Sequence, residues 1–213
     1  MPVREIRSKQ RGVTGRYFSW KAGRTVAHES ILERNLFLLL DGDPRVRTFE
    51  EQPCRIEFEG PRGKRRYTPD ARVEYVDGAV ELVEVKYDQD LGRMSVEQRA
   101  DLELAFDAAR AFCTAKGWTF RLRTNAEIGG PLLERANRLN MHGRAPAALP
   151  TVGPRVLDLV ECTPGITLGE LVGRLGDGGA QSCALHLVWR GELRDDPMAP
   201  PDLETRLFRG RAP

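Results

Sequence analysis

The alternation of apolar and polar residues through the first two thirds of the chain predicts helices and strands in mixed order. Residues 28–44 carry leucines at helical spacing and end in Asp-Gly-Asp-Pro, a pattern that predicts a helix with a clear stop. Apolar and charged side chains alternate in residues 46–60, where Pro53 interrupts an extended segment. Residues 95–117 predict a long amphipathic helix, and residues 119–124 predict a short strand after it. This order favours an α/β domain with a mixed central sheet flanked by helices.

Residues 67–87, YTPDARVEYVDGAVELVEVKY, predict two strands joined by an Asp-Gly turn. Two registers fit this hairpin. A two-residue loop places Asp70 opposite Val85. A three-residue loop, in which Gly78 takes a left-handed conformation, places Asp70 opposite Glu84. The sequence is compatible with both.

The composition changes at the end of a main domain that we expect to span residues 28–141. Residues 142–154 are rich in proline and glycine, so we expect a linker there. Residues 155–196 contain three short helical patterns followed by a small hairpin, which favours a winged-helix-like domain. Proline is frequent from residue 197 onwards, and residues 197–213 are therefore expected to form an irregular tail.

The composition fits a soluble globular protein, because the 213-residue chain is 40% apolar and 30% charged. No apolar run reaches the ~18 residues of a membrane helix and no signal peptide opens the chain, so we expect a cytoplasmic protein without a membrane partner. Four cysteines without CxxC spacing and three scattered histidines argue against disulfides and structural zinc. A metal would instead be held by oxygen ligands, which favours magnesium or manganese.

The charges are nearly balanced, with a net charge of +2, but the basic residues are unevenly distributed. Residues 1–27 contain seven basic side chains and the single acid Glu5, which predicts a basic N-terminal arm that is either solvated or bound to nucleic acid. A second basic group lies in a turn after residue 60 and suits phosphate contacts, with a solvated loop as the equal alternative. This group consists of Arg62, Lys64, Arg65 and Arg66.

The carboxylates of Asp70 and Glu84 and the ammonium of Lys86 are the main candidates for chemistry. Side chains two apart on a strand share a face, so Glu84 and Lys86 lie together, and the hairpin returns Asp70 to the same end. Two converging carboxylates would hold a hard divalent cation, and a lysine beside them can orient a water or stabilise charge on a phosphate. The alternative from spacing alone is a salt-bridged surface hairpin, in which Glu-x-Lys is common.

The segment TPD followed by EVK resembles the signature of the PD-(D/E)xK nucleases. More specifically, residues 17–130 resemble TnsA, the endonuclease subunit of heteromeric transposases. The resemblance rests on the ordered segments SILERNLFLLL, EEQP, TPDARV, VEVK, AFCTAKGW and FRLRTNAEI. It implies a restriction-endonuclease-like core.

The resemblance also implies a role for individual residues. Glu33 falls at the family's acidic position on the first helix and would complete the acidic cluster as a further metal ligand. Asp70 and Glu84 would hold Mg²⁺ or Mn²⁺ together with the backbone carbonyl of Val85, and Lys86 would assist the attacking water. Some TnsA proteins carry glutamine at the position of Glu84, and a glutamate there should bind the metal more strongly.

Two further polar residues, Glu29 and Gln52, could have either a functional or a structural role. Glu29, one turn before Glu33, is the rival acid on the first helix, although an acid is also favourable at the positive end of a helix dipole. Gln52 matches a family position, but a polar residue beside Pro53 is more often structural.

By resemblance, the protein would nick transposon ends on the strand that is not joined to the target. A DDE-type transposase subunit would process the other strand, and a regulatory ATPase is a further expected partner. One alternative is a stand-alone restriction or repair nuclease of the same fold. A non-enzyme alternative is an adaptor that binds DNA or protein and carries a decayed nuclease domain.

Overall fold

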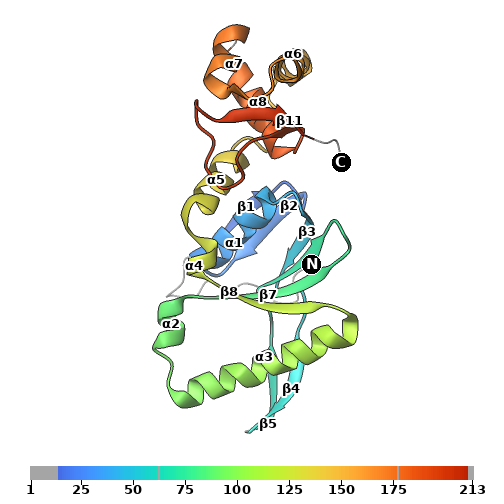
Figure 1. Ribbon diagram of the computed structural model, residues 1–213. Coiled ribbons are helices and arrows are strands. Elements are labelled where there is room, and N and C mark those ends of the chain that lie inside the picture. The colour runs from blue at the N-terminus through green and yellow to red at the C-terminus, as the bar shows by residue number, and fades with distance from the viewer. Residues whose placement is uncertain (1–13, 62, 177, 211–213) are drawn as a thin grey trace. The chain divides into compact units, whose positions relative to one another are not determined.

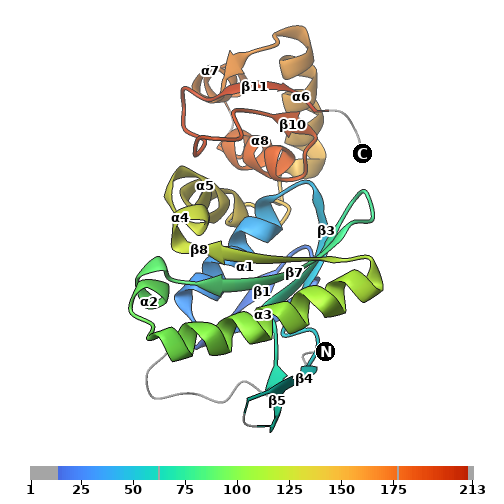
Figure 2. The same ribbon diagram turned by 60° about the horizontal axis from the view of Figure 1, so that its bottom comes forward.

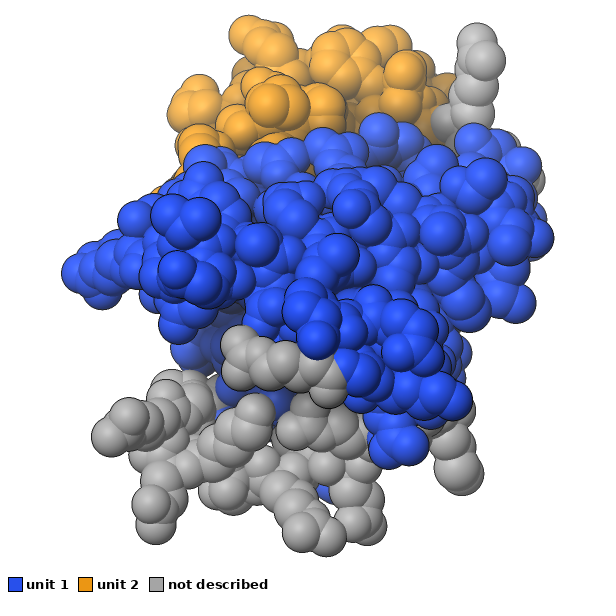
Figure 3. Space-filling view, turned by 90° about the horizontal axis from the view of Figure 1, so that it is seen from below, with its two compact units in different colours: residues 1–129 blue, residues 130–213 orange. Residues whose placement is uncertain are grey.

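The structure is a computed structural model that describes residues 14–61, 63–176 and 178–210 (Figure 1). The chain divides into two compact units, Met1–Gly129 and Gly130–Pro213 (Figure 3). None of the helices within the described ranges is both long and apolar enough to span a membrane.

The first unit contains strands and helices in mixed order. They are β1 (Gly15–Ser19), β2 (Arg24–His28), α1 (Ile31–Gly42), β3 (Val46–Glu51), β4 (Ile56–Gly60), β5 (Gly63–Tyr67), β6 (Ala71–Tyr75), β7 (Val80–Lys86), α2 (Asp88–Gly92), α3 (Val96–Lys116), β8 (Thr119–Thr124) and α4 (Asn125–Ile128).

The central sheet of this unit has the strand order β3-β6-β7-β8. β6 is antiparallel to both of its neighbours, β3 and β7, whereas β8 lies parallel to β7 after the chain crosses over through α3. The mixed sheet predicted from the sequence is therefore confirmed. α1 and α3 cover opposite faces of the sheet (Figure 2). Buried Leu36, Phe37, Val73 and Val83 belong to the α1 side, and buried Leu82, Ala109 and Cys113 belong to the α3 side.

The register of the β6–β7 hairpin decides between the two sequence alternatives. Ala71 pairs with Val83, so Asp70, one step before the strand, stands opposite Glu84. Gly78 has a φ of 89° and lies in a three-residue loop that is closed by the Tyr75–Ala79 backbone hydrogen bond. The register with the three-residue loop is therefore the one that forms. Glycine allows it, because glycine adopts a positive φ without steric cost.

The end of the expected basic arm is ordered, which corrects the prediction for residues 14–27. β1 and β2 form an antiparallel hairpin, and Val26 is fully buried against α1. Arg24 forms two hydrogen bonds to the buried carboxylate of Glu51, at 2.7 and 2.5 Å. Lys21 donates to the backbone carbonyls of Asp43 and Val46. These basic side chains therefore hold the hairpin to the core. Residues 1–13 lie outside the described residues.

The second unit has a small sheet packed against helices. Its elements are α5 (Gly130–Asn140), α6 (Leu149–Cys162), β9 (Ile166–Thr167), α7 (Leu168–Leu175), α8 (Ala180–Trp189), β10 (Leu193–Arg194) and β11 (Arg206–Arg209). The strand order is β10-β11-β9. The core contains Val156, Val160, Ile166, Leu171, Cys183, Leu187, Leu193 and Leu207.

The structure corrects three expected boundaries. The division falls after Gly129 instead of residue 141, because α5 packs on α8 of the second unit. α6 begins inside the expected linker, since Pro150 lies in its first turn, where a missing N–H costs nothing. The expected irregular tail contains β11, which is the central strand of the small sheet and buries Leu207 completely.

Candidate active site

Glu84 and Lys86 lie in the half of β7 that is farther from the β6–β7 turn, where alternation places them on one face of the strand. The side chains of Val83 and Val85 point to the opposite face and pack with α1. The Glu84 carboxylate is 4% exposed and both of its oxygens have partners. The Lys86 ammonium donates to Oε1 at 2.5 Å, and the Tyr67 hydroxyl donates to Oε2 at 2.7 Å.

Asp70 lies at the start of β6, directly opposite Glu84. The carboxylate of Asp70 accepts a hydrogen bond from the backbone N–H of Val85 at 2.8 Å. The backbone carbonyl of Asp70 accepts one from the N–H of Gln52 at 3.0 Å. The residue is therefore held from both neighbouring strands, although Pro69 before it has no N–H to offer to the sheet.

Glu33 lies in the first turn of α1 and is 9% exposed. Its carboxylate accepts from the backbone N–H of Glu29 at 2.8 Å and from the Ser30 hydroxyl at 2.9 Å. The Ser30 hydroxyl in turn accepts from the N–H of Glu33 at 3.1 Å, which caps the helix. Glu33 therefore has a structural role at the helix start as well as its place beside the other acids.

The charges of these residues act on one another. Burial raises the pKa of the Asp70 carboxyl well above its usual range, and the negative charges of Glu84 and Glu33 add to this rise. Burial also raises the pKa of Glu33, with a contribution from Glu84. Burial lowers the pKa of Lys86, but the carboxylates of Glu84 and Asp70 outweigh it and leave that pKa raised. Three acids and one ammonium thus form a cluster with an excess of negative charge.

The donor set of the cluster suits a hard divalent cation. Within residues 14–61, 63–176 and 178–210, no three His, Cys, Asp or Glu side chains form a ready-made metal site. The Asp70 and Glu84 carboxylates and the Val85 carbonyl nevertheless offer only oxygens, the ligands that Mg²⁺ and Mn²⁺ prefer. Burial first, and the nearby negative charges second, raise the pKa of Asp70, and a cation bound there would offset both effects. The residues present therefore fit the implied metal.

The proposed DNA-binding residues lie on the β4–β5 hairpin, outside the acidic cluster. Arg65 pairs with Asp101 of α3 at 2.8 Å, and Arg66 pairs with Glu57 at 3.2 Å. Lys64 stands opposite Glu59 in the hairpin. Arg62 lies outside the described residues. Each described basic residue of this group therefore has an acidic neighbour, which reduces the positive charge available for phosphate.

Sequence reasoning assigned no role to Tyr67, although its hydroxyl is one of two groups that fix Glu84. Tyr67 ends β5, and its ring packs edge-on against Phe106 and Phe120. Burial raises the pKa of the Tyr67 hydroxyl, so it remains a proton donor. The only signal in the sequence was a tyrosine three residues before Asp70.

A mixed sheet with helices on both faces, and with acids and a lysine at the ends of two central strands, is a nuclease-like fold. Residues 43–125 match the family model described as TnsA-like endonuclease N terminal. The matched segment contains Asp70, Glu84 and Lys86 and begins after Glu33. The match confirms the resemblance found in the sequence: residues 43–125 are similar to the N-terminal domain of TnsA-like endonucleases. A comparison with curated proteins found no match.

Proposed function

We propose that the protein is a Mg²⁺- or Mn²⁺-dependent DNA endonuclease that nicks the non-transferred strand at transposon ends, as a subunit of a heteromeric transposase. The observation that carries this proposal is the acidic cluster, in which Asp70, Glu84 and Glu33 share the single ammonium of Lys86. Burying several carboxylates with one ammonium lowers the stability of the folded state, and such clusters with shifted pKa values are found at functional sites.

The residues of the cluster divide the work. Asp70, Glu84 and the Val85 carbonyl would hold the cation, with Glu33 as the further acid. When bound, a divalent cation lowers the pKa of a coordinated water and offsets charge on the scissile phosphate. Lys86, which donates to Glu84, would orient the attacking water and stabilise the charge that develops on the phosphate. Tyr67 keeps the Glu84 carboxylate in place.

Recruitment by partners fits the weak positive charge of the chain. The net charge is +2, and Arg65 and Arg66 are already paired with acids. Because non-specific DNA affinity comes mainly from phosphate contacts, the chain alone should bind DNA weakly. A DDE-type transposase subunit and a regulatory ATPase would bring it to the transposon ends.

The second unit is proposed to be a winged-helix-like domain. Its order of helices and strands, α6-β9-α7-α8-β10-β11, and its sheet order support this assignment. α8 occupies the place of a recognition helix, but it carries no Asp, Glu, Lys or Arg, and Cys183 through Val188 are all buried. Only its N-terminal end offers polar side chains, the exposed Gln181 and the partly exposed Ser182, and it has no basic residue for phosphates, so a protein partner suits the unit better than a DNA groove.

A nicking assay on end-labelled transposon-end DNA tests the proposal. Wild type and Asp70→Ala would be compared in Mg²⁺ and in EDTA, each with and without the proteins encoded beside this one. We expect cuts on one strand only, from wild type, with Mg²⁺ and partners present. Equal cutting without partners would favour the stand-alone nuclease, and unchanged transposition by Asp70→Ala would favour the adaptor.

A further inference from the structure

Gln52 combines two features that reduce the stability of the fold. Its φ is 44°, and it is the only non-glycine residue with a positive φ in the part of the chain that the structure describes. This left-handed conformation costs an L-residue on the order of 1 kcal/mol. Its side chain is buried, with the residue 6% exposed, and no described residue donates a hydrogen bond to its Oε1. A residue selected for stability alone would avoid both features, which tend to gather at functional sites.

The backbone of Gln52 fixes Asp70. β3 pairs with β6 up to Glu51 and Ala71, and the N–H of Gln52 adds one more bond, to the Asp70 carbonyl at 3.0 Å. The chain then leaves the sheet, since Pro53 has no N–H. The left-handed conformation thus occurs at the last backbone hydrogen bond between β3 and the β6 segment, next to Asp70.

The side chain of Gln52 reaches the segment that carries Glu33. Its Nε2 donates to the Glu29 carboxylate at 3.3 Å. The backbone N–H of Glu29 donates to the Glu33 carboxylate at 2.8 Å. One residue therefore connects two acids that come from distant parts of the chain, Asp70 through its backbone and Glu33 through Glu29.

We propose that Gln52 is a positioning residue, which sets the placement of Glu33 relative to Asp70 and so the geometry in which the cluster accepts a divalent cation. This inference rests on the proposed function for its catalytic consequence, but it concerns the arrangement of the chain's own acids. Gln52 itself touches neither metal ligand with its side chain, and it acts through Glu29.

Two variants separate positioning from stability. Gln52→Gly and Gln52→Ala both keep the backbone N–H and both lose the bond to Glu29. Glycine also relieves the left-handed backbone, whereas alanine does not, so the glycine variant should have the higher melting temperature. We expect both to lower Mn²⁺ affinity, measured by calorimetry on the full chain, and the nicking rate with partners by about 10-fold. This is the lower end of the effect of direct partners of metal ligands, because Gln52 acts through Glu29.

An exchange of donor and acceptor supplies a rescue. Gln52→Glu alone places two carboxylates against each other and should weaken Mn²⁺ binding. The double variant Glu29→Gln/Gln52→Glu restores an amide–carboxylate bond with the same total charge, and it should recover most of the lost affinity and nicking.

The outcomes distinguish this inference from the proposed function. If the wild type nicks DNA, and Gln52→Gly has the same Mn²⁺ affinity and nicking rate as the wild type, the role of Gln52 is overturned but the proposed nuclease function is not. Losses that follow the melting temperatures, with Gln52→Ala far worse than Gln52→Gly, would show a purely structural role and also overturn it. Absence of nicking by wild type with its partners would overturn the proposed function, whereas a Mn²⁺ affinity lowered in Gln52→Gly and recovered by the exchange would still support positioning.

Discussion

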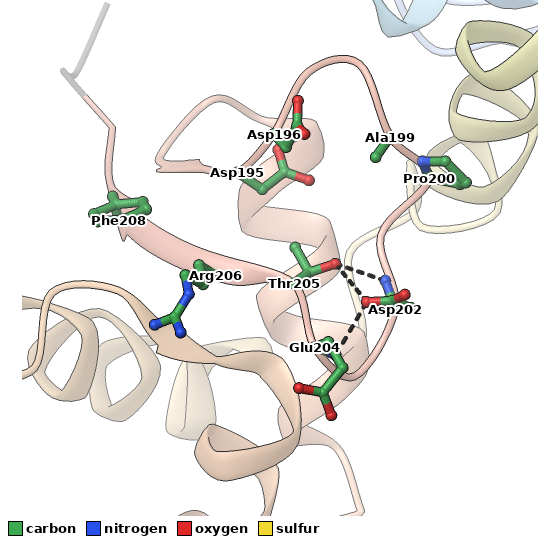
Figure 4. Close-up of a pocket in the computed structure, with 9 residues that line it drawn as sticks. All are labelled: Asp195, Asp196, Ala199, Pro200, Asp202, Glu204, Thr205, Arg206 and Phe208. Atoms are coloured by element: carbon green, nitrogen blue, oxygen red, sulfur yellow. Dashed lines mark hydrogen bonds between the residues drawn. The ribbon is translucent and has the colours of Figure 1, made fainter.

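Acidic side chains gather in both units, but they are neutralised in different ways. In the second unit, the loop between β10 and β11 lines a pocket with Asp195, Asp196, Asp202 and Glu204 (Figure 4). The side chain of Asp195 is buried, and Arg135 donates to both of its oxygens, at 2.5 and 2.7 Å.

Two other acids of this loop, Asp196 and Asp202, accept hydrogen bonds from within the loop itself. The Asp202 carboxylate accepts from the Thr205 hydroxyl and from the N–H of Glu204, each at 3.0 Å (Figure 4). In the first unit, by contrast, Glu33, Asp70 and Glu84 share one lysine. The comparison teaches that burial of several acids around one shared ammonium, more than the number of carboxylates, distinguishes a candidate cation site from acids that hold a loop together.

The strongest test of this contrast replaces one acid from each group. Asp70→Asn should lower the nicking rate by more than about 100-fold, because even the outer partners of metal ligands are worth about 10–100-fold. Asp202→Asn makes the same chemical change in the exposed loop and should leave the rate unchanged. Both rates would be measured under single-turnover conditions. A comparable loss in Asp202→Asn would remove the distinction between the two groups.

For the free energy of unfolding, we expect the larger effect from an acid of the second unit. Asp195→Ala leaves Arg135 without its buried partner and should destabilise the second unit by about 3 kcal/mol. Asp196→Ala, an exposed neighbour, should cost much less. Urea unfolding followed by circular dichroism would compare the two variants, and equal midpoints would show that the Arg135–Asp195 pair contributes little.

The hydroxyl of Tyr67 should matter to activity more than to folding. Tyr67→Phe removes the bond to Glu84 and is expected to reduce nicking about 10-fold. Tyr75→Phe is a matched control, since the Tyr75 hydroxyl donates to Glu81 at 3.0 Å in the same sheet. Nicking rates at several Mg²⁺ concentrations would check this; equal effects of the two variants would assign Tyr67 to general packing.

The smallest expected effect is a gain in stability. Because the folded state raises the pKa of Asp70, it binds a proton more readily than the unfolded chain, so ionised Asp70 is a cost at neutral pH that disappears as the pH falls through the raised pKa. Without metal, Asp70→Asn should therefore melt a few degrees above wild type at pH 7, with a gap that closes toward acid pH. Calorimetric melting at several pH values measures it, and a gap that widens in acid would contradict the assignment.

Much of the fold followed from periodicity, because long amphipathic patterns and turn residues act locally. The hairpin of β1 and β2 was missed, since its apolar residues alternate with basic ones that suggested a solvated arm. β11 was missed because the prolines around it masked a short strand whose Leu207 is buried by distant elements. Such burial depends on tertiary contacts that a local pattern does not contain.

The same limit applies to the site. The strand residues Glu84 and Lys86 could be placed on one face from alternation alone, whereas the partner of Asp70 depended on the register, which Gly78 decides. Tyr67 and Gln52 were not assigned to the cluster, because their contacts join segments that lie apart in the sequence. These contacts exist only once the sheet has formed.

The loop of the β6–β7 hairpin offers a practical handle. Val76 is 55% exposed there, and the loop lies at the end of both strands that is opposite to Asp70, a separation of roughly 20 Å at about 3.3 Å per residue. Exposed loop tips tolerate insertions well. A fluorescent label attached at this loop should therefore report on assembly with partner proteins in real time while leaving the chemistry undisturbed.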